Sequence, residues 1–239
     1  MTPRRRRPAI LLRLALVLAV VAGVVLTALG PATVTGLLPY FTIQSNVAVG
    51  VLAGYAAWCA LRDRPEPPSA LKGAMTLYIT ITGTVYHLVL ANPASPFAMA
   101  QPDRQPGEWW GNQFLHTVVP LLAFADWALF DRRGRLPPRH AAWWLAFPVA
   151  YLGFALVRGL VVDRYPYPFL DAGRLGYGGV TVSAVGFAVA FWLLGLLFVG
   201  VDRLLARAGR SGSAQSPPAA PTDLPAPVRP ASREPTGSG

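Results

Sequence analysis

Residues Ile10–Gly30 read ILLRLALVLAVVAGVVLTALG, an apolar run long enough to cross a lipid bilayer as one helix. A bilayer core about 30 Å thick takes roughly 20 helical residues at about 1.5 Å each. Five further apolar stretches follow between short loops: Phe41–Leu61, Leu71–Ala91, Asn112–Phe130, Ala141–Leu160 and Gly178–Leu205. Lipid offers no hydrogen-bond partner to bare backbone groups, so these segments must be helices. The sequence therefore predicts an all-α, polytopic membrane protein with six transmembrane helices in a bundle.

The 239-residue chain carries a net charge of +10, and its basic residues are spread unevenly over the loops. If six helices are threaded in order, one side receives Arg4, Arg5, Arg6, Arg7, Arg13, Arg62, Arg64, Lys72, Arg132, Arg133, Arg135, Arg139, Arg203, Arg207 and Arg210. On the other side, a few arginines are balanced by acidic residues of the same loops. This positive-inside pattern predicts a plasma-membrane protein with cytoplasmic N- and C-termini. A nucleic-acid-binding face needs Lys and Arg interleaved with exposed aromatic or polar residues, so no nucleic-acid partner is expected.

The end of the chain differs in composition from the helical body. Residues 209–239 are rich in Pro, Ser, Ala and Gly, so a disordered cytoplasmic tail is predicted after a transmembrane domain spanning residues 1–208. The first helix shares a basic start and an apolar run with signal peptides, but its run is longer than their core. An uncleaved helix is therefore preferred, and cleavage would leave the orientation of the other helices unchanged.

Polar residues gather at one depth in the predicted spans, near the outer leaflet. Thr42 and Asn46 lie four residues apart, on one face, at the start of the second helix. His87 lies about one turn from the outer end of the third helix, His116 about one turn into the fourth, and Arg158 near the outer end of the fifth. Ionisable groups within a span are costly and usually face a protein interior or a wet cavity. We expect one polar pocket that opens outward. The structural alternatives are that the small polar residues hold helices together, that the histidines are packing residues, and that Arg158 extends to the lipid headgroups.

Three short motifs resemble the androgen-induced/ADTRP-like family of multi-pass membrane proteins. They are Tyr40-Phe41-Thr42-Ile43, Phe114-Leu115-His116-Thr117-Val118-Val119-Pro120 and Tyr167-Pro168-Phe169-Leu170-Asp171. Some members of that family hydrolyse fatty acid esters of hydroxy fatty acids with a threonine nucleophile and a histidine base. For this chain the resemblance implies Thr42 as nucleophile, His116 as base, and an outer loop containing Tyr167 and Asp171. The pair Asp126-Trp127 and Arg158 look like features of a bacterial branch.

The residue types themselves allow acyl transfer, because an imidazole can accept a hydroxyl proton while the oxygen attacks an ester carbonyl. Asp163, Asp171 or a backbone carbonyl would orient the base. The leading hypothesis is an integral membrane hydrolase of lipid (fatty acyl) esters, with Asn46 or His87 donating to the oxyanion. The expected substrate-binding residues are Asn46, His87, Arg158, Tyr167 and Asp171.

Two alternatives stay open at this stage. One is a non-catalytic membrane protein whose pocket binds lipid as a sensor. The other is a proton-coupled transporter that uses the histidines, Asp126 and a threonine stripe, Thr76, Thr80 and Thr84.

No metal or cofactor is expected. The single cysteine, Cys59, excludes a cysteine-based metal cluster. Two membrane histidines without inward carboxylates or thiols make a poor zinc site. A haem between His87 and His116 is the remaining cofactor alternative.

Overall fold

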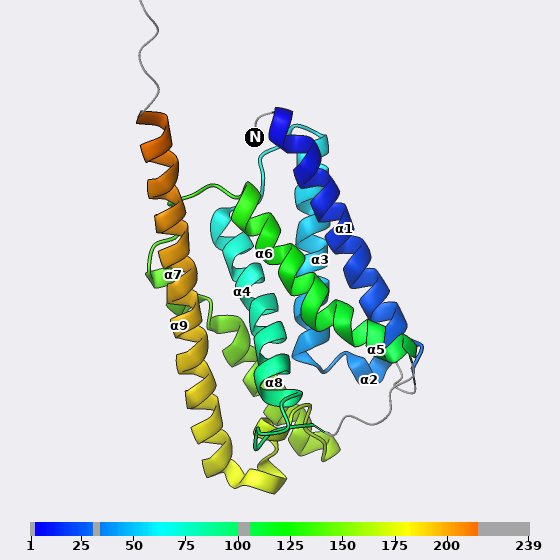
Figure 1. Ribbon diagram of the computed structural model, residues 1–239. Helices are drawn as coiled ribbons and strands as arrows, with labels where there is room; N and C mark the ends of the chain where they lie inside the picture. Colours follow the sequence, from blue (N-terminus) through cyan, green and yellow to red (C-terminus); the bar gives the residue numbers. More distant parts are fainter. Residues whose placement is uncertain (1–2, 31–33, 100–105, 215–239) are drawn as a thin grey trace, which may run out of the picture.

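The computed structural model describes residues 3–30, 34–99 and 106–214, and the elements within these ranges are all helical (Figure 1). The elements are α1 (Pro3–Ala28), α2 (Val34–Leu37), α3 (Phe41–Leu61), α4 (Ser69–Val85), the π-helix η1 (Tyr86–Leu90), α5 (Pro106–Gln113), the π-helix η2 (Phe114–Val118), α6 (Val119–Phe130), α7 (Arg139–Trp143), α8 (Ala146–Val162), the 3₁₀-helix η3 (Pro168–Leu170) and α9 (Ala172–Ala214).

Six helical segments of the described chain are long and apolar enough to cross a membrane. They are Arg5–Ala28, Phe41–Leu61, Ser69–Leu90, Pro106–Phe130, Arg139–Val162 and Ala172–Ala208. The expectation of six such helices is confirmed. The fourth and sixth begin earlier than predicted, at Pro106 and Ala172, because polar first turns extend them beyond the apolar runs.

The segments divide into a packed group and a flanking pair. Helix α1 packs on α3, α5 and α6, and α4 packs on α3 and α6. Helix α9 stands to one side, where it contacts α7, η3 and α4 (Figure 1). The first turn of α1 and the last turn of α9 lie at one end of the bundle (Figure 1). We call this the basic end, defined by Arg13 and Glu66, and the opposite end the site end, defined by Thr42 and His116.

Helix α9 is longer than the other elements. Its axis breaks at Gly176, whose φ of 66° lies in the left-handed region that favours glycine. The helix continues past the boundary expected at residue 208 and ends at Ala214. Residues 215–239, the remainder of the predicted tail, lie outside the described residues.

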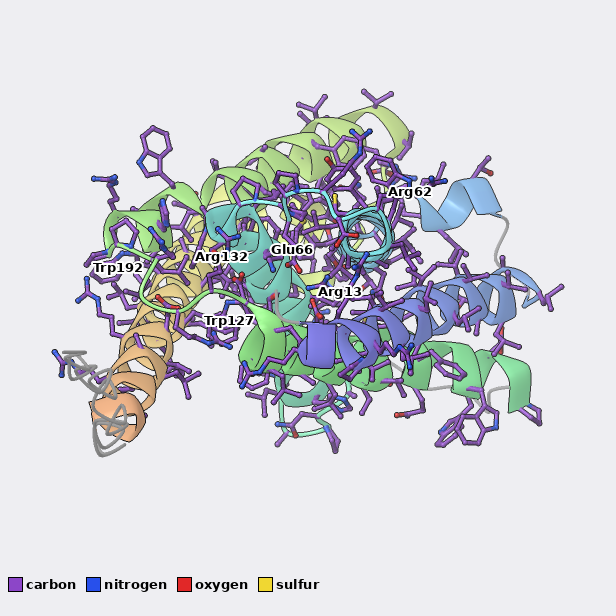
Figure 2. All side chains as sticks on the ribbon, turned by 90° about the horizontal axis from the view of Figure 1, so that it is seen from above. Arg13, Arg62, Glu66, Trp127, Arg132 and Trp192 are labelled. Carbon is purple, nitrogen blue, oxygen red and sulfur yellow. The ribbon has the colours of Figure 1, made fainter. Side chains whose placement is uncertain are left out.

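A buried ion network joins the helices at the basic end. The Arg13 guanidinium, fully buried, lies 2.9 Å from Asp126 Oδ1 and 3.1 Å from Glu66 Oε2. Lys72 Nζ lies 2.8 Å from Glu66 Oε2 and 2.9 Å from Asp131 Oδ1. Viewed onto this end, Arg13 and Glu66 lie close together among the helices (Figure 2). Arg13 and Lys72 were expected among the basic residues flanking the spans; both are buried instead, because carboxylates from other elements pair with them.

Glu66 lies in the loop between α3 and α4 and links the two cations. Burial by itself raises the pKa of Glu66, but hydrogen bonds from Arg13 and Lys72 outweigh burial and lower it. The carboxylate is therefore held in its charged form.

Candidate functional site

Thr42 and His116 come from separate helices and meet at the site end. Thr42 lies in the first turn of α3, and its Oγ1 is 3.2 Å from His116 Nε2. His116 lies in the middle of η2 and is buried. The predicted meeting of this hydroxyl and this imidazole is thus present, and their catalytic roles stay predictions.

The other ring nitrogen of His116 fixes the tautomer. His116 Nδ1 lies 3.1 Å from the backbone oxygen of Asn112, one turn earlier in the same span. A carbonyl oxygen can only accept a hydrogen bond, so Nδ1 carries the hydrogen and Nε2 of the neutral ring presents a lone pair to Thr42. The backbone carbonyl is one of the orienting groups that the sequence allowed.

The His116 ring is also held by an aromatic neighbour. The Tyr86 ring stacks on it with a centroid distance of 4.1 Å and an interplanar angle of 26°. Tyr86 begins η1, and His116 lies in η2, so two π turns from neighbouring spans lie side by side. Such widened turns occur often at functional sites.

The π turn around His116 has a local cause. Pro120 lacks an N–H and cannot donate to the carbonyl four residues earlier, which belongs to His116. Just before it, the Val119 N–H bonds to Phe114 O, five residues back. Gly83 of α4 packs against this turn, and a Cβ there would lie 2.8 Å from His116 O. The close approach of the two spans therefore requires glycine at position 83.

Asn46 connects the two helices that carry Thr42 and His116. It is fully buried, and its Nδ2 donates to Thr42 O at 2.8 Å and to Leu115 O at 3.2 Å. The side chain therefore ties the first turn of α3 to η2. Both amide hydrogens are used in this way, so the expected role of Asn46 as an oxyanion donor is not supported by its geometry.

Tyr167 reaches the pair from the loop between α8 and α9. Its hydroxyl accepts a hydrogen bond from Thr42 N at 3.3 Å and lies 3.4 Å from Thr42 Oγ1. The ring stacks on Phe169 at a centroid distance of 5.2 Å and meets Tyr40 edge-on. The loop is anchored on α8, where the Tyr165 ring occupies the space that a Cβ at Gly159 would need.

An apolar cavity of about 120 Å³ adjoins Thr42. Its walls come from α3, α4, η1, α8, α9 and the Tyr167 loop, and it is lined by Phe41, Thr42, Ile81, Thr82, Val85, Leu90, Leu145, Pro148, Val149, Tyr151, Leu152, Tyr167, Phe169, Leu170, Ala184, Phe187, Ala188 and Phe191. Val149 is 58% exposed, so the cavity reaches the outer face of the bundle beside α8. An apolar cavity of roughly 150 Å³ holds a benzene molecule, so this one suits a short segment of a single acyl chain.

Three of the expected substrate-binding residues lie elsewhere. His87 is exposed, and its Nε2 lies 3.0 Å from Thr117 Oγ1, because in η1 the inner position is taken by Tyr86. Arg158, near the end of α8, donates to the backbone oxygen of Arg164 in the loop that follows. Asp171 accepts a hydrogen bond from Arg174 N and so caps the first turn of α9. The cluster around Thr42 therefore includes His116, Asn46 and Tyr167 but not these three residues, and of its members only Thr42 and Tyr167 line the apolar cavity.

The threonine stripe of α4 does not form a polar path. Thr76 Oγ1 donates to Lys72 O and Thr80 Oγ1 to Thr76 O, so these two of its three hydroxyls are bonded to their own helix. Asp126 pairs with Arg13 near the basic end. These contacts give the transporter alternative no support.

Among the residues that the structure describes, no three His, Cys, Asp or Glu side chains are grouped to hold a metal. His116 Nε2 faces Thr42 and His87 Nε2 faces Thr117. The two imidazoles are thus directed at different hydroxyls, which does not fit a haem shared between them.

Comparison of the chain with protein-family models, curated proteins and solved structures found no match. The resemblance to the androgen-induced/ADTRP-like family therefore rests on the three motifs given above.

Several contributors to the site leave no recognisable signal in the amino-acid sequence. Asn112 acts through its carbonyl, which any residue has, and Tyr86 is one aromatic residue among many in the spans. The apolar cavity arises from helix placement. Gly83 carried a detectable signal, since a glycine inside a helix often marks a close approach.

Proposed function

We propose that this protein is an integral membrane hydrolase of fatty acyl esters, with Thr42 as the nucleophile and His116 as the general base. One observation carries the proposal. The Thr42 hydroxyl lies between the lone pair of His116 Nε2 and an apolar cavity that suits an acyl chain. The family resemblance points to the same two residues.

The reaction follows from the positions of the protons. Thr42 Oγ1 attacks the ester carbonyl carbon while its proton passes to His116 Nε2. The tetrahedral intermediate collapses, the C–O bond to the alcohol breaks, and the imidazolium returns the proton to the leaving alcohol. Water then attacks the acyl–Thr42 ester with His116 again accepting a proton, and the fatty acid and free Thr42 are released.

The placement of the site agrees with a substrate that stays in the membrane. We place the protein in the plasma membrane with both termini in the cytoplasm, because the basic residues gather on that side. The site end then faces the outer leaflet. An acyl chain would enter beside Val149 on α8, while the ester group meets Thr42 near the interface.

Activity-based labelling tests the proposal on the purified full-length protein in detergent. A fluorophosphonate probe should label the wild-type protein, and a fluorogenic medium-chain ester should be turned over. Thr42→Ala should remove both signals, and His116→Ala should lower turnover by about 10²–10⁴-fold, the usual contribution of a general base.

Matched controls separate chemistry from folding. Thr80→Ala removes a hydroxyl bonded to its own helix, and His140→Ala removes a histidine from α7, outside the contacts of Thr42. Both should keep full labelling and turnover. Wild-type protein that neither reacts nor turns over ester, yet binds fatty acid in the cavity, would refute hydrolysis and favour the lipid-binding alternative.

A further inference from the structure

The acyl-transfer reaction proposed above needs a hydrogen-bond donor for the oxyanion, and the sequence-based candidates do not supply it. The two amide hydrogens of Asn46 go to Thr42 O and Leu115 O. His87 is exposed and faces Thr117. The donor must therefore be sought among the groups that line the cavity beside Thr42.

The place of the oxyanion is set by the nucleophile. After attack, the former carbonyl carbon is bonded to Thr42 Oγ1, so the negatively charged oxygen lies two bonds from Oγ1. The acyl chain occupies the cavity, and the base approaches Oγ1 from His116, which is not one of the lining residues. A useful donor therefore contacts Thr42 from the cavity wall.

Elimination among the cavity-lining hydroxyl groups leaves one candidate. Thr42 is the nucleophile, and Thr82 Oγ1 donates to Tyr78 O. The Tyr151 hydroxyl donates to Pro39 O at 2.9 Å. The fourth hydroxyl is that of Tyr167, whose oxygen lies 3.4 Å from Thr42 Oγ1 and accepts from Thr42 N; it also interacts with the Tyr151 hydroxyl and the Phe41 backbone.

We propose that Tyr167 is a further catalytic residue, which donates its phenolic hydrogen to the oxyanion. This inference rests on the proposed ester hydrolysis. The Thr42 N–H, in the first turn of α3, donates to the Tyr167 oxygen at 3.3 Å. This bond and the positive end of the helix dipole polarise the phenol and make it a stronger donor. The same contact holds the hydroxyl beside the nucleophile before substrate arrives.

The protonation state of Tyr167 is consistent with donation. The ring and hydroxyl are buried, and burial raises the pKa of Tyr167 above its ordinary value. The phenol therefore keeps its hydrogen throughout the neutral pH range.

Tyr167→Phe is the direct test, with ester turnover, fluorophosphonate labelling and thermal unfolding measured in parallel. We expect kcat to fall by about 10²–10³-fold, as for loss of one oxyanion donor. KM should stay within about twofold, since the contact forms mainly in the transition state. Affinity for an alkyl trifluoromethyl ketone, which becomes an oxyanion on Thr42, should fall, whereas affinity for the corresponding secondary alcohol should not. A purely structural role would weaken both ligands together.

The controls make the outcomes distinguishable. Tyr78→Phe removes a buried hydroxyl from α4 outside the cavity lining and should leave kcat unchanged. If the wild-type protein shows no turnover that depends on Thr42, both the proposed function and this inference are wrong. Thr42-dependent turnover with full kcat in Tyr167→Phe would overturn the inference alone. If Tyr167→Phe does not fold, the wild-type protein is tested on an ester and on its thionoester, whose sulfur accepts hydrogen bonds weakly. Equal hydrolysis rates on the two substrates would overturn the inference.

Discussion

The two ends of the bundle bury polar residues in different ways. At the basic end, Arg13 and Lys72 are paired with carboxylates at distances of 2.8 to 3.1 Å. At the site end the buried groups around Thr42 are neutral hydroxyls, an amide and an imidazole, and its Oγ1 contacts measure 3.2 and 3.4 Å.

Under the proposed function, this difference separates a structural role from a chemical one. Short ion pairs among buried charges hold helices in place, because breaking one pair strands its partner in a low-dielectric environment. Longer contacts between neutral groups let a proton move and a substrate group intervene. We therefore expect substitutions at the basic end to change stability, and substitutions at the site end to change turnover.

Arg13→Leu should give the largest change in stability. It leaves Glu66 and Asp126 without their shared cation, so the free energy of unfolding should fall by about 3–5 kcal/mol. Unfolding in detergent followed by circular dichroism measures this, and labelling per folded molecule should stay unchanged. Arg6→Leu is the control, because its partner Asp63 is 80% exposed and such surface pairs contribute about 0–1 kcal/mol. Equal losses in the two variants would contradict the distinction.

Glu66→Gln should reduce stability by about 1.5–3 kcal/mol at neutral pH, because an amide cannot replace the charged acceptor for Arg13 and Lys72. The folded-state pKa of Glu66 is lowered, so its contribution is full above the unfolded pKa and is lost as pH falls through the folded pKa. Wild-type stability should therefore decline in acid more steeply than that of Glu66→Gln. Parallel pH profiles of the two proteins would speak against this assignment.

Gly83→Ala tests the packing of the helices at the site end. The added methyl would lie 2.8 Å from His116 O, so overpacking should cost about 1–3 kcal/mol and shift η2. Ester turnover per folded molecule should fall with it. Gly153→Ala in α8 meets no heavy atom within 4 Å and should keep both stability and turnover.

Thr42→Ser should have the smallest effect. It keeps the hydroxyl that contacts His116 and removes a methyl group, so stability should change by about 0.5 kcal/mol or less. Fluorophosphonate labelling should persist, in contrast to Thr42→Ala. Loss of labelling in the serine variant despite normal unfolding would argue that the hydroxyl is not the reacting group.

Much of the helical layout could be predicted from the sequence, because span length and hydropathy are local properties. The meeting of Thr42 and His116 was predictable from depth and the three motifs. The exclusion of His87 was not, since one widened turn decides whether His87 or Tyr86 faces inward. Arg13 lies inside an apolar run, which is itself a sign of a buried partner, but its carboxylates come from distant segments.

The direction of the His116 side chain depends on the number of residues in the π turn Phe114–Val118. A π turn holds one residue more than the α-helical turn it replaces. Deleting a single residue there would restore the tighter α-helical turn and leave the flanking parts of the helix in register, but it would redirect the side chains within the turn, His116 among them. An indel at this point, with every functional side chain still encoded, would disconnect the imidazole from its hydroxyl.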